Sequence, residues 1–281
     1  MSPLVRLFAS RAAGESSCPD AVMSGLIAQL RKSSRHKGLA AQLGDCLAQR
    51  LVFQSEFVSG LPSDGYIEPI GSSFNEGFRM VLKKGSTQVR TRFTIAHELC
   101  HTFFYEIVPE LKFGSVEVDP EEERLCNLGA AELLIPTKSL KAQAKLVEIS
   151  LNSLEKLAAM YTVSTEAMLL RLRSLKLWDC ELSFWRRKVD GSFSMDRIIG
   201  GRKVNWTWPD DVPLNAAWNT NGKPVGRTYL ELRGSDGSLQ LRSVCYEVGR
   251  RGNELASLWS AKPIEQRRKN LPLFQAPIQP A

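Results

Sequence analysis

The stretch RTRFTIAHELCHTFFYE, residues 90–106, places two of the three histidines of the chain four residues apart, with a glutamate directly after the first. Apolar residues on both sides predict a largely buried helix over about 88–106, capped by Ser86 or Thr87. Residues four apart lie on one face of an α-helix, so His97 and His101 can reach the same metal ion. This helix therefore offers two ligands of a metal site.

Glu98 lies about 100° around the same helix from His97. That position is displaced from the two imidazoles, yet close enough for Glu98 to take a proton from a water on the metal, which is the role of a general base. The alternative is a surface helix with two solvated histidines. The apolar flanks disfavour it, because buried imidazoles and carboxylates need partners.

A catalytic zinc site takes three protein ligands and a water, so one ligand is still missing. His36 lies in the basic stretch RKSSRHKG, which makes it a poor candidate. A better source is the next helix, which Asp119-Pro120 and three following glutamates predict from about 120 to 134.

On that second helix Glu123 and Asn127 lie four apart and share a face with small alanines, which let two helices approach closely. Glu123 can thus offer a carboxylate to the metal, and Asn127 can hydrogen-bond a ligating imidazole. Glu121 and Glu122 compete with Glu123, although both also suit the positive end of the helix dipole. The residues alone leave this choice open.

The composition is that of an ordinary globular protein, with 281 residues, 43% apolar and 24% charged. Its six cysteines follow no regular framework, and no apolar run approaches the roughly 18 residues of a membrane span. The first residues are too short and too interrupted for a signal peptide, so we expect a frayed start and a cytoplasmic protein without membrane contact. The net charge is +7, and residues 180–281 carry 16 of the 37 basic but only 10 of the 30 acidic side chains.

The residue pattern divides the chain into four parts, and an α+β architecture is expected. Residues 1–50 form a helical region, and 51–140 form a core in which short strands such as RLVFQSEF and GFRMVLKKG precede the two helices. Residues 141–179 contain two helical patterns, SLEKLAAMYT and STEAMLLRLRSLKL, joined by a short turn. Residues 180–281 hold alternating runs, a Gly-Ser-Asp-Gly turn and a proline-rich tail, and predict a basic, β-rich accessory domain.

The segments RFTIAHELCH and ERLCNLGAAELLIP resemble the ImmA/IrrE family of metallopeptidases, whose pattern is approximately RFTxAHELGH followed by ExxANxFAAxLLMP. The similarity spans about residues 50–178. It implies a zincin-like core that binds zinc, with manganese as the alternative. By this resemblance His97, His101 and Glu123 are the metal ligands, Glu98 is the catalytic base, and Asn127 falls on the family asparagine.

The same resemblance implies an endopeptidase with a protein substrate, a partner helix-turn-helix repressor that is cut to release genes under stress or phage control. Two departures from the family pattern are Cys100, where glycine is usual, and Gly129, where phenylalanine is usual. Neither touches a ligand or the base. We expect Cys100 to pack rather than to bind metal, and metal binding by Cys126 is the less favoured interpretation.

Three alternatives remain. The chain could keep the metal fold but act by binding DNA or a repressor without proteolysis. Residues 154–174 have the spacing of a DNA-binding helix-turn-helix, with Ser164 as N-cap and Arg171 on its second helix, although packing is the favoured interpretation. The tryptophans and arginines beyond residue 180 admit nucleic-acid binding, but a tryptophan-filled core is favoured. Tyr105 and Arg92 are candidates for stabilising an oxyanion by proximity only.

Overall fold

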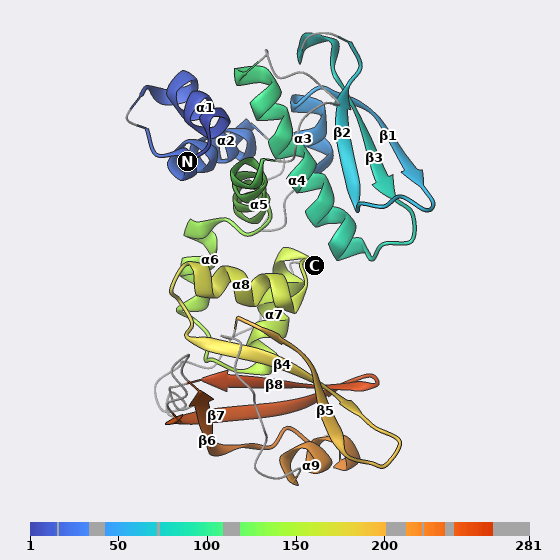
Figure 1. Ribbon diagram of the computed structural model, residues 1–281, viewed down its shortest axis with the longest axis vertical. Helices are drawn as coiled ribbons and strands as arrows, with labels where there is room; N and C mark the ends of the chain where they lie inside the picture. The colour runs from blue at the N-terminus through green and yellow to red at the C-terminus, as the bar shows by residue number, and fades with distance from the viewer. Residues whose placement is uncertain are drawn as a thin grey trace, which may run out of the picture. The chain divides into compact units, whose positions relative to one another are not determined.

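The computed structural model describes residues 1–15, 17–33, 43–71, 74–108, 119–200, 212–220, 222–233 and 239–260 (Figure 1). His36, the Gly-Ser-Asp-Gly turn and the proline-rich tail lie outside these ranges. The chain forms two compact units, one of Met1–Ala142 with Leu157–Arg171, the other of Gln143–Lys156 with Leu172–Ala281. The domain boundaries at 50, 140 and 179 stay predictions.

The sheet of the first unit has three strands in the order β1-β3-β2. β1 (Val52–Val58) runs parallel to β3 (Phe78–Lys83), and β2 (Gly65–Pro69) runs antiparallel to it. The short 3-10 helix η1 (Phe74–Glu76) precedes β3. β3 is the central strand, and four of its residues are buried: Phe78, Met80, Val81 and Leu82. β2 is therefore an edge strand, and its residues form one wall of the site described below.

Two helices carry the predicted site residues. α4 (Gln88–Ile107) begins after Thr87, whose side chain accepts a hydrogen bond from the backbone of Arg90. α5 (Pro120–Leu134) begins after Asp119, whose carboxylate accepts from Glu121 N. Both helices lie where the sequence predicts them, because the caps, the proline and the first-turn glutamates are local signals. The α+β architecture is confirmed.

The expectation of a frayed N-terminus is wrong. α1 (Pro3–Ala13) is capped by Ser2, and α2 (Pro19–Ser33) follows it. Phe8 is fully buried and stacks on Phe104 of α4, with 4.2 Å between ring centroids. Val5, Phe8 and Ala9 are spaced by three and one residues and form one buried helix face. Burial of this face against the core orders the start of the chain.

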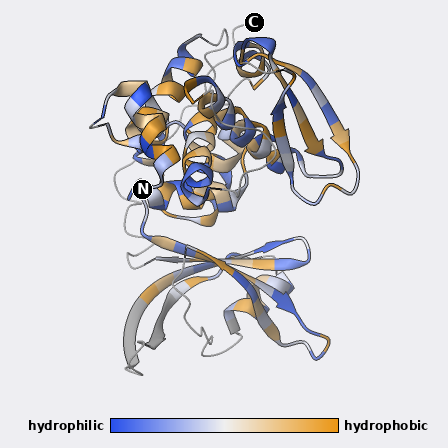
Figure 2. Cartoon of the chain, turned by 45° about the horizontal axis from the view of Figure 1, so that its top comes forward, coloured by the Kyte–Doolittle hydropathy of each residue, from blue (hydrophilic) through white to orange (hydrophobic). Residues whose placement is uncertain are grey.

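The remaining helices are α3 (Leu43–Gln49), α6 (Thr137–Ala144), α7 (Leu151–Tyr161) and α8 (Thr165–Ser174). Figure 2 shows hydrophobic and hydrophilic residues alternating along the helices, as expected where one face is buried. Ser164 caps α8, as predicted, by accepting from Ala167 N. Arg171 of α8 is buried, however, and donates to the carbonyl of Ile135 and the carboxylate of Glu132. Its guanidinium is thus committed to packing, which agrees with the favoured interpretation of this segment.

The second unit contains a five-stranded antiparallel sheet in the order β5-β4-β8-β7-β6. Its strands are β4 (Cys180–Arg187), β5 (Phe193–Ile199), β6 (Val225–Arg233), β7 (Leu239–Arg251) and β8 (Glu254–Ser260), with the helix α9 (Val212–Thr220). Trp185 and Trp259 are buried, and both indole N–H groups donate to Ser183 Oγ, at 3.0 and 2.8 Å. These tryptophans fill a core, and the β-rich character of this region is confirmed.

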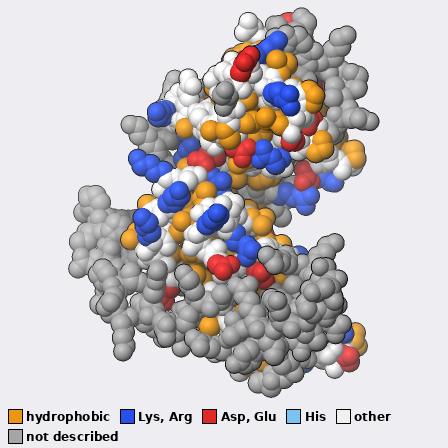
Figure 3. Space-filling model, turned by 60° about the vertical axis from the view of Figure 1, so that its left-hand side comes forward, with side chains coloured by type: hydrophobic (Ala, Val, Ile, Leu, Met, Phe, Trp, Pro, Cys, Tyr) orange, Lys and Arg blue, Asp and Glu red, His pale blue; other side chains and the backbone are white. Residues whose placement is uncertain are grey.

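Among the described residues, no helix is both long enough and apolar enough to cross a membrane. Figure 3 shows one face of the molecule, and on its described part acidic and basic side chains lie among hydrophobic ones.

Candidate metal centre

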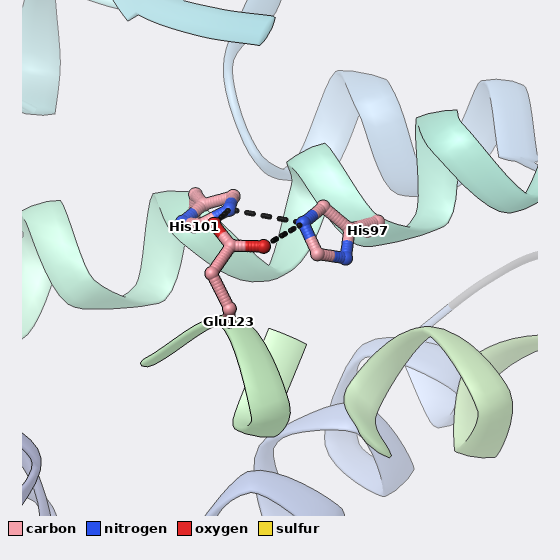
Figure 4. A group of neighbouring side chains, drawn as sticks. All are labelled: His97, His101 and Glu123. Atoms are coloured by element: carbon pink, nitrogen blue, oxygen red, sulfur yellow. Dashed lines mark hydrogen bonds and ion pairs between the residues drawn. The ribbon is translucent and has the colours of Figure 1, made fainter. Parts of the chain in front are cut away.

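Three side chains from α4 and α5 converge on one point (Figure 4). The Nε2 atoms of His97 and His101 are 3.2 Å apart. The carboxylate of Glu123 approaches both rings, with Oε2 3.3 Å from His97 Nε2 and Oε1 3.4 Å from His101 Nε2. The structure thus brings together the three residues that the family resemblance nominates as ligands.

The spacing of these atoms fits a tetrahedral metal ion. With metal–ligand bonds of about 2.0–2.1 Å, two ligands of a tetrahedral zinc lie roughly 3.3–3.4 Å apart. The three measured separations fall at or slightly below this range. A set of two imidazoles and one carboxylate is also a common donor set for catalytic zinc. The residues present therefore fit the group that the resemblance implies.

Two further residues hold the imidazoles in the orientation that this geometry needs. His97 Nδ1 lies 3.2 Å from Asn127 Oδ1, and His101 Nδ1 lies 2.8 Å from Glu122 Oε1. Both oxygens are acceptors, so each ring carries its proton on Nδ1 and keeps the lone pair of Nε2 for a metal. Asn127 was proposed for this position from sequence, whereas Glu122 was not.

The three glutamates at the start of α5 have separate partners. Glu121 pairs with the amino group of Met1 at 3.2 Å and accepts from Ser2 N. Glu122 accepts from His101, and Glu123 faces both Nε2 atoms. The close approach of the His101 and His97 rings holds the pKa of Glu123 well below its usual value. Of the three glutamates, Glu123 is the one that faces both Nε2 atoms, because of how α5 is rotated against α4.

Glu98 lies beside the cluster and is 7% exposed. Burial raises the pKa of its carboxyl, an effect that the neighbouring His101 and His97 oppose. The carboxylate also takes a hydrogen bond from the backbone of Ile67 in β2. Glu98 is therefore held between the metal-type cluster and the edge strand, as a base in a cleft would be.

A cavity of about 540 Å³ opens at the cluster. It is bounded by β2 and the loop before it, by α4 and by α5, and its lining includes Tyr66, Ile67, Phe93, Thr94, Tyr105 and Asn127 with the four charged or ligating residues above. Of the two oxyanion candidates, Tyr105 lines the cavity, while Arg92 is not among its lining residues. Burial raises the pKa of Tyr105 to about 12, so its hydroxyl keeps its proton at neutral pH.

A buried His-Glu-x-x-His helix beside a mixed sheet, with a carboxylate from the following helix, defines a zincin-like metallopeptidase core. Residues 70–173 match the model of the family described as the IrrE N-terminal-like domain, Peptidase_M78. The resemblance to ImmA/IrrE proteins is thereby confirmed.

Among solved structures, the chain is similar to a Mycobacterium tuberculosis transcriptional regulator, with 17% identity, a TM-score of 0.45 and 86% of each chain covered. No curated protein matches the chain.

Proposed function

We propose that the chain is a zinc-dependent endopeptidase that hydrolyses a peptide bond in a protein substrate. The observation that carries this proposal is the convergence of His97 Nε2, His101 Nε2 and the Glu123 carboxylate at tetrahedral spacing, with buried Glu98 beside them. Zinc suits this nitrogen and oxygen donor set, and Mn²⁺ is the alternative occupant.

The reaction follows from what each residue can do. When bound, the metal supplies Lewis acidity, which polarises a scissile carbonyl and acidifies a water. Glu98 accepts the proton of the attacking water and delivers it to the leaving amine. The Ile67 N–H fixes the carboxylate, while Asn127 and Glu122 fix the two imidazoles.

The edge strand β2 suggests how a substrate would lie. β2 pairs with β3 alone among the described strands, and its residues Gly65, Tyr66 and Ile67 line the cavity. An extended peptide can add to an exposed sheet edge through main-chain hydrogen bonds, with little dependence on its side chains. Such a segment would run past Glu98 and the metal cluster.

The identity of the substrate rests on the family resemblance. We propose a partner helix-turn-helix repressor, encoded beside this gene and cut in the cytoplasm to release genes under stress or phage control. The domain boundaries at 50, 140 and 179 belong to the same proposal, with residues 180–281 as an accessory domain. Its basic charge admits nucleic-acid binding, which a salt-dependent shift of duplex DNA would reveal.

The test compares wild-type protein with Glu98→Gln, each co-expressed with the adjacent helix-turn-helix regulator. We expect both proteins to contain one metal ion per chain, and only the wild type to cleave the regulator. Glu121→Gln is the matched control, because it neutralises an acid on the ligand helix outside the cavity. Equal cleavage by wild type and Glu98→Gln would overturn the proposal. If neither protein cleaves but both bind the regulator, the chain is a binding protein that keeps the metal fold.

A further inference from the structure

The strand β1 (Val52–Val58) forms an open edge of the three-stranded sheet. It pairs with β3 alone among the described strands, and Figure 1 shows it as the outermost strand on its side of this sheet. All of its residues are exposed or partly exposed, and the side chains of Phe53 and Phe57 are 62% and 57% exposed. An edge strand presents N–H and C=O groups that can pair with another chain. β1 therefore offers both backbone groups and apolar surface to a partner strand.

The features that usually protect an edge strand are sparse in β1. Natural edges carry lysines, prolines, inward-pointing charges or bulges that prevent further pairing. β1 contains no lysine and no proline, and its pairing with β3 has a single irregularity, which leaves Phe53 without a register partner. Its one charged side chain, Glu56, is paired with Arg79 of β3. The segment from Gln54 to Val58 is thus regular and open on its outer side.

The sequence of β1 reads nearly the same in both directions. The seven residues are VFQSEFV, and those equally far from the central Ser55 match in type. The matching pairs are Val52 with Val58, Phe53 with Phe57, and Gln54 with Glu56. Two copies of such a strand, antiparallel about a two-fold axis at Ser55, place each residue opposite its match, because a two-fold interface uses the same patch on both subunits. The edge is complementary to itself.

Charge selects this register over its neighbours. An axis at Glu56 would place two carboxylates directly opposite each other, which is destabilising. An axis at Gln54 would place Val52 opposite Glu56. With the axis at Ser55, the Gln54 amide of one copy faces the Glu56 carboxylate of the other and can donate to it, while Arg79 pairs with the same carboxylate within its own chain.

We propose that two copies of this chain associate through their β1 strands, antiparallel and with the two-fold axis at Ser55. The two three-stranded sheets then form one sheet of six strands, and the exposed phenylalanines of each copy cover those of the other. Seven residues a side is small against the roughly 20–30 of a standard interface, so the dimer dissociates on dilution. β2, which lines the cavity, is the opposite edge of the sheet and stays accessible in the dimer.

The first experiment is cross-linking of the full-length chain in a Cys18→Ser background, because Cys18 is the exposed one of the six cysteines. Ser55→Cys brings two thiols together at the axis, where the Cβ atoms of opposite residues lie about 4.5–5.5 Å apart. Ser59→Cys is the matched control, since Ser59 is also exposed and lies just beyond β1. Its counterpart is eight residue steps away in the proposed pair, or roughly 26 Å.

We expect a short thiol-reactive cross-linker to join two copies of Ser55→Cys and not two copies of Ser59→Cys. Equal yields from the two variants, or no covalent dimer from Ser55→Cys, would overturn the proposal.

The second experiment measures association without a covalent bond, by sedimentation equilibrium of the full-length chain at increasing concentration. We expect the average mass of wild type to rise toward that of a dimer. Gln54→Glu places like charges opposite each other twice per dimer and should raise the dissociation constant about tenfold. Phe57→Ser should weaken association as well. Ile70→Ser is the matched control, because Ile70 is 46% exposed and lies outside β1.

Each of these substitutions changes an exposed side chain, so the monomer keeps its fold. A wild type that stays monomeric at all concentrations would overturn the proposal. So would a dimer that Gln54→Glu and Phe57→Ser leave unchanged, or one that Ile70→Ser weakens as much as they do, because the interface would then lie elsewhere.

Discussion

The thiol of Cys100 occupies the space that a side chain at Gly129 would need. A Cβ built on Gly129 would lie 2.6 Å from Cys100 Sγ, closer than two such atoms approach in proteins, and 3.1 Å from two atoms of Met23. Cys100 and Gly129 are two positions at which the chain departs from the ImmA/IrrE pattern. The larger residue on α4 faces the smaller one on α5, so the two departures compensate each other where the ligand helices touch.

This relationship predicts the effect of Gly129→Ala. In the wild-type background the added methyl group overpacks the α4–α5 contact, and we expect a loss of about 1–3 kcal/mol in the free energy of unfolding. In the Cys100→Ala background the sulfur is gone and only the flexible Met23 side chain has to shift, while alanine is favoured over glycine in a helix by about 1 kcal/mol. The same substitution should then be neutral or stabilising. Urea unfolding of the four proteins measures the difference, and an equal loss in both backgrounds would contradict it.

Gly65 provides a second packing test, at the cavity wall. A Cβ at this position would lie 2.7 Å from Thr94 Cγ2 and 2.9 Å from the carbonyl oxygen of Val81, which belongs to the backbone and cannot turn away. Gly65→Ala should therefore displace β2 from α4 and move the Ile67 N–H away from Glu98. We expect cleavage of the proposed substrate to fall at least tenfold while bound metal stays at one equivalent.

The control for this change is Gly25→Ala in α2, where a Cβ meets nothing within 4 Å. It should leave cleavage unchanged and add up to about 1 kcal/mol of stability. Unchanged cleavage in Gly65→Ala would show that the position of β2 does not set the activity.

The sequence predicted the two ligand helices to within a residue, because their caps and first turns are encoded locally. It did not locate β2, since the five residues GYIEP are short and become a strand only by pairing with β3. The helix at the N-terminus had visible apolar spacing at Val5 and Phe8, yet its stability comes from packing on Phe104, far along the chain.

The candidate site likewise combines residues that local spacing predicts with residues that only tertiary packing brings into contact. His97, Glu98 and His101 follow from spacing on one helix, and Asn127 follows from its place one turn after Glu123. Glu122 could not be assigned in this way, because a first-turn glutamate suits the helix dipole wherever it points. Its contact with His101 depends on the rotation of α5 against α4, which is set by tertiary packing.

The buried guanidinium of Arg171 separates a structural role from DNA recognition. It donates to Glu132, to Thr137 Oγ1 and to the Ile135 carbonyl. Arg171→Ala removes a buried cation and the ion pair of Glu132, which keeps only its hydrogen bonds from Thr137. We expect a loss of about 3–5 kcal/mol in unfolding free energy. Arg124→Ala, which breaks the exposed pair with Asp20, should cost about 0–1 kcal/mol. Similar losses in the two variants would refute the packing role.

Glu247 should make the stability of the second unit depend on pH. Its buried carboxylate accepts a hydrogen bond from Leu151 N at 2.8 Å, and burial raises its pKa above the ordinary value of 4.5. The folded state then binds this proton more tightly than the unfolded chain, so stability falls as the pH rises from below 4.5 through the folded pKa. Glu247→Gln should lack this decline. Urea unfolding at several pH values between about 4 and 7.5 measures how the free energy of unfolding of wild type and of Glu247→Gln changes with pH. Equal slopes for the two proteins would contradict the assignment.

Asn127 tests whether the orientation of an imidazole matters for the metal. Its Oδ1 atom accepts the Nδ1 proton of His97, which keeps Nε2 directed at His101 and Glu123. Asn127→Leu preserves the size of the side chain but removes the acceptor, and we expect metal affinity to fall about 10- to 100-fold. Asn127→Asp keeps an acceptor and should bind metal nearly as tightly as wild type. Competition with a chelator measures the affinities, with Asn152→Leu, at an exposed position of α7, as the control. Wild-type affinity in Asn127→Leu would mean that packing alone holds His97 in place.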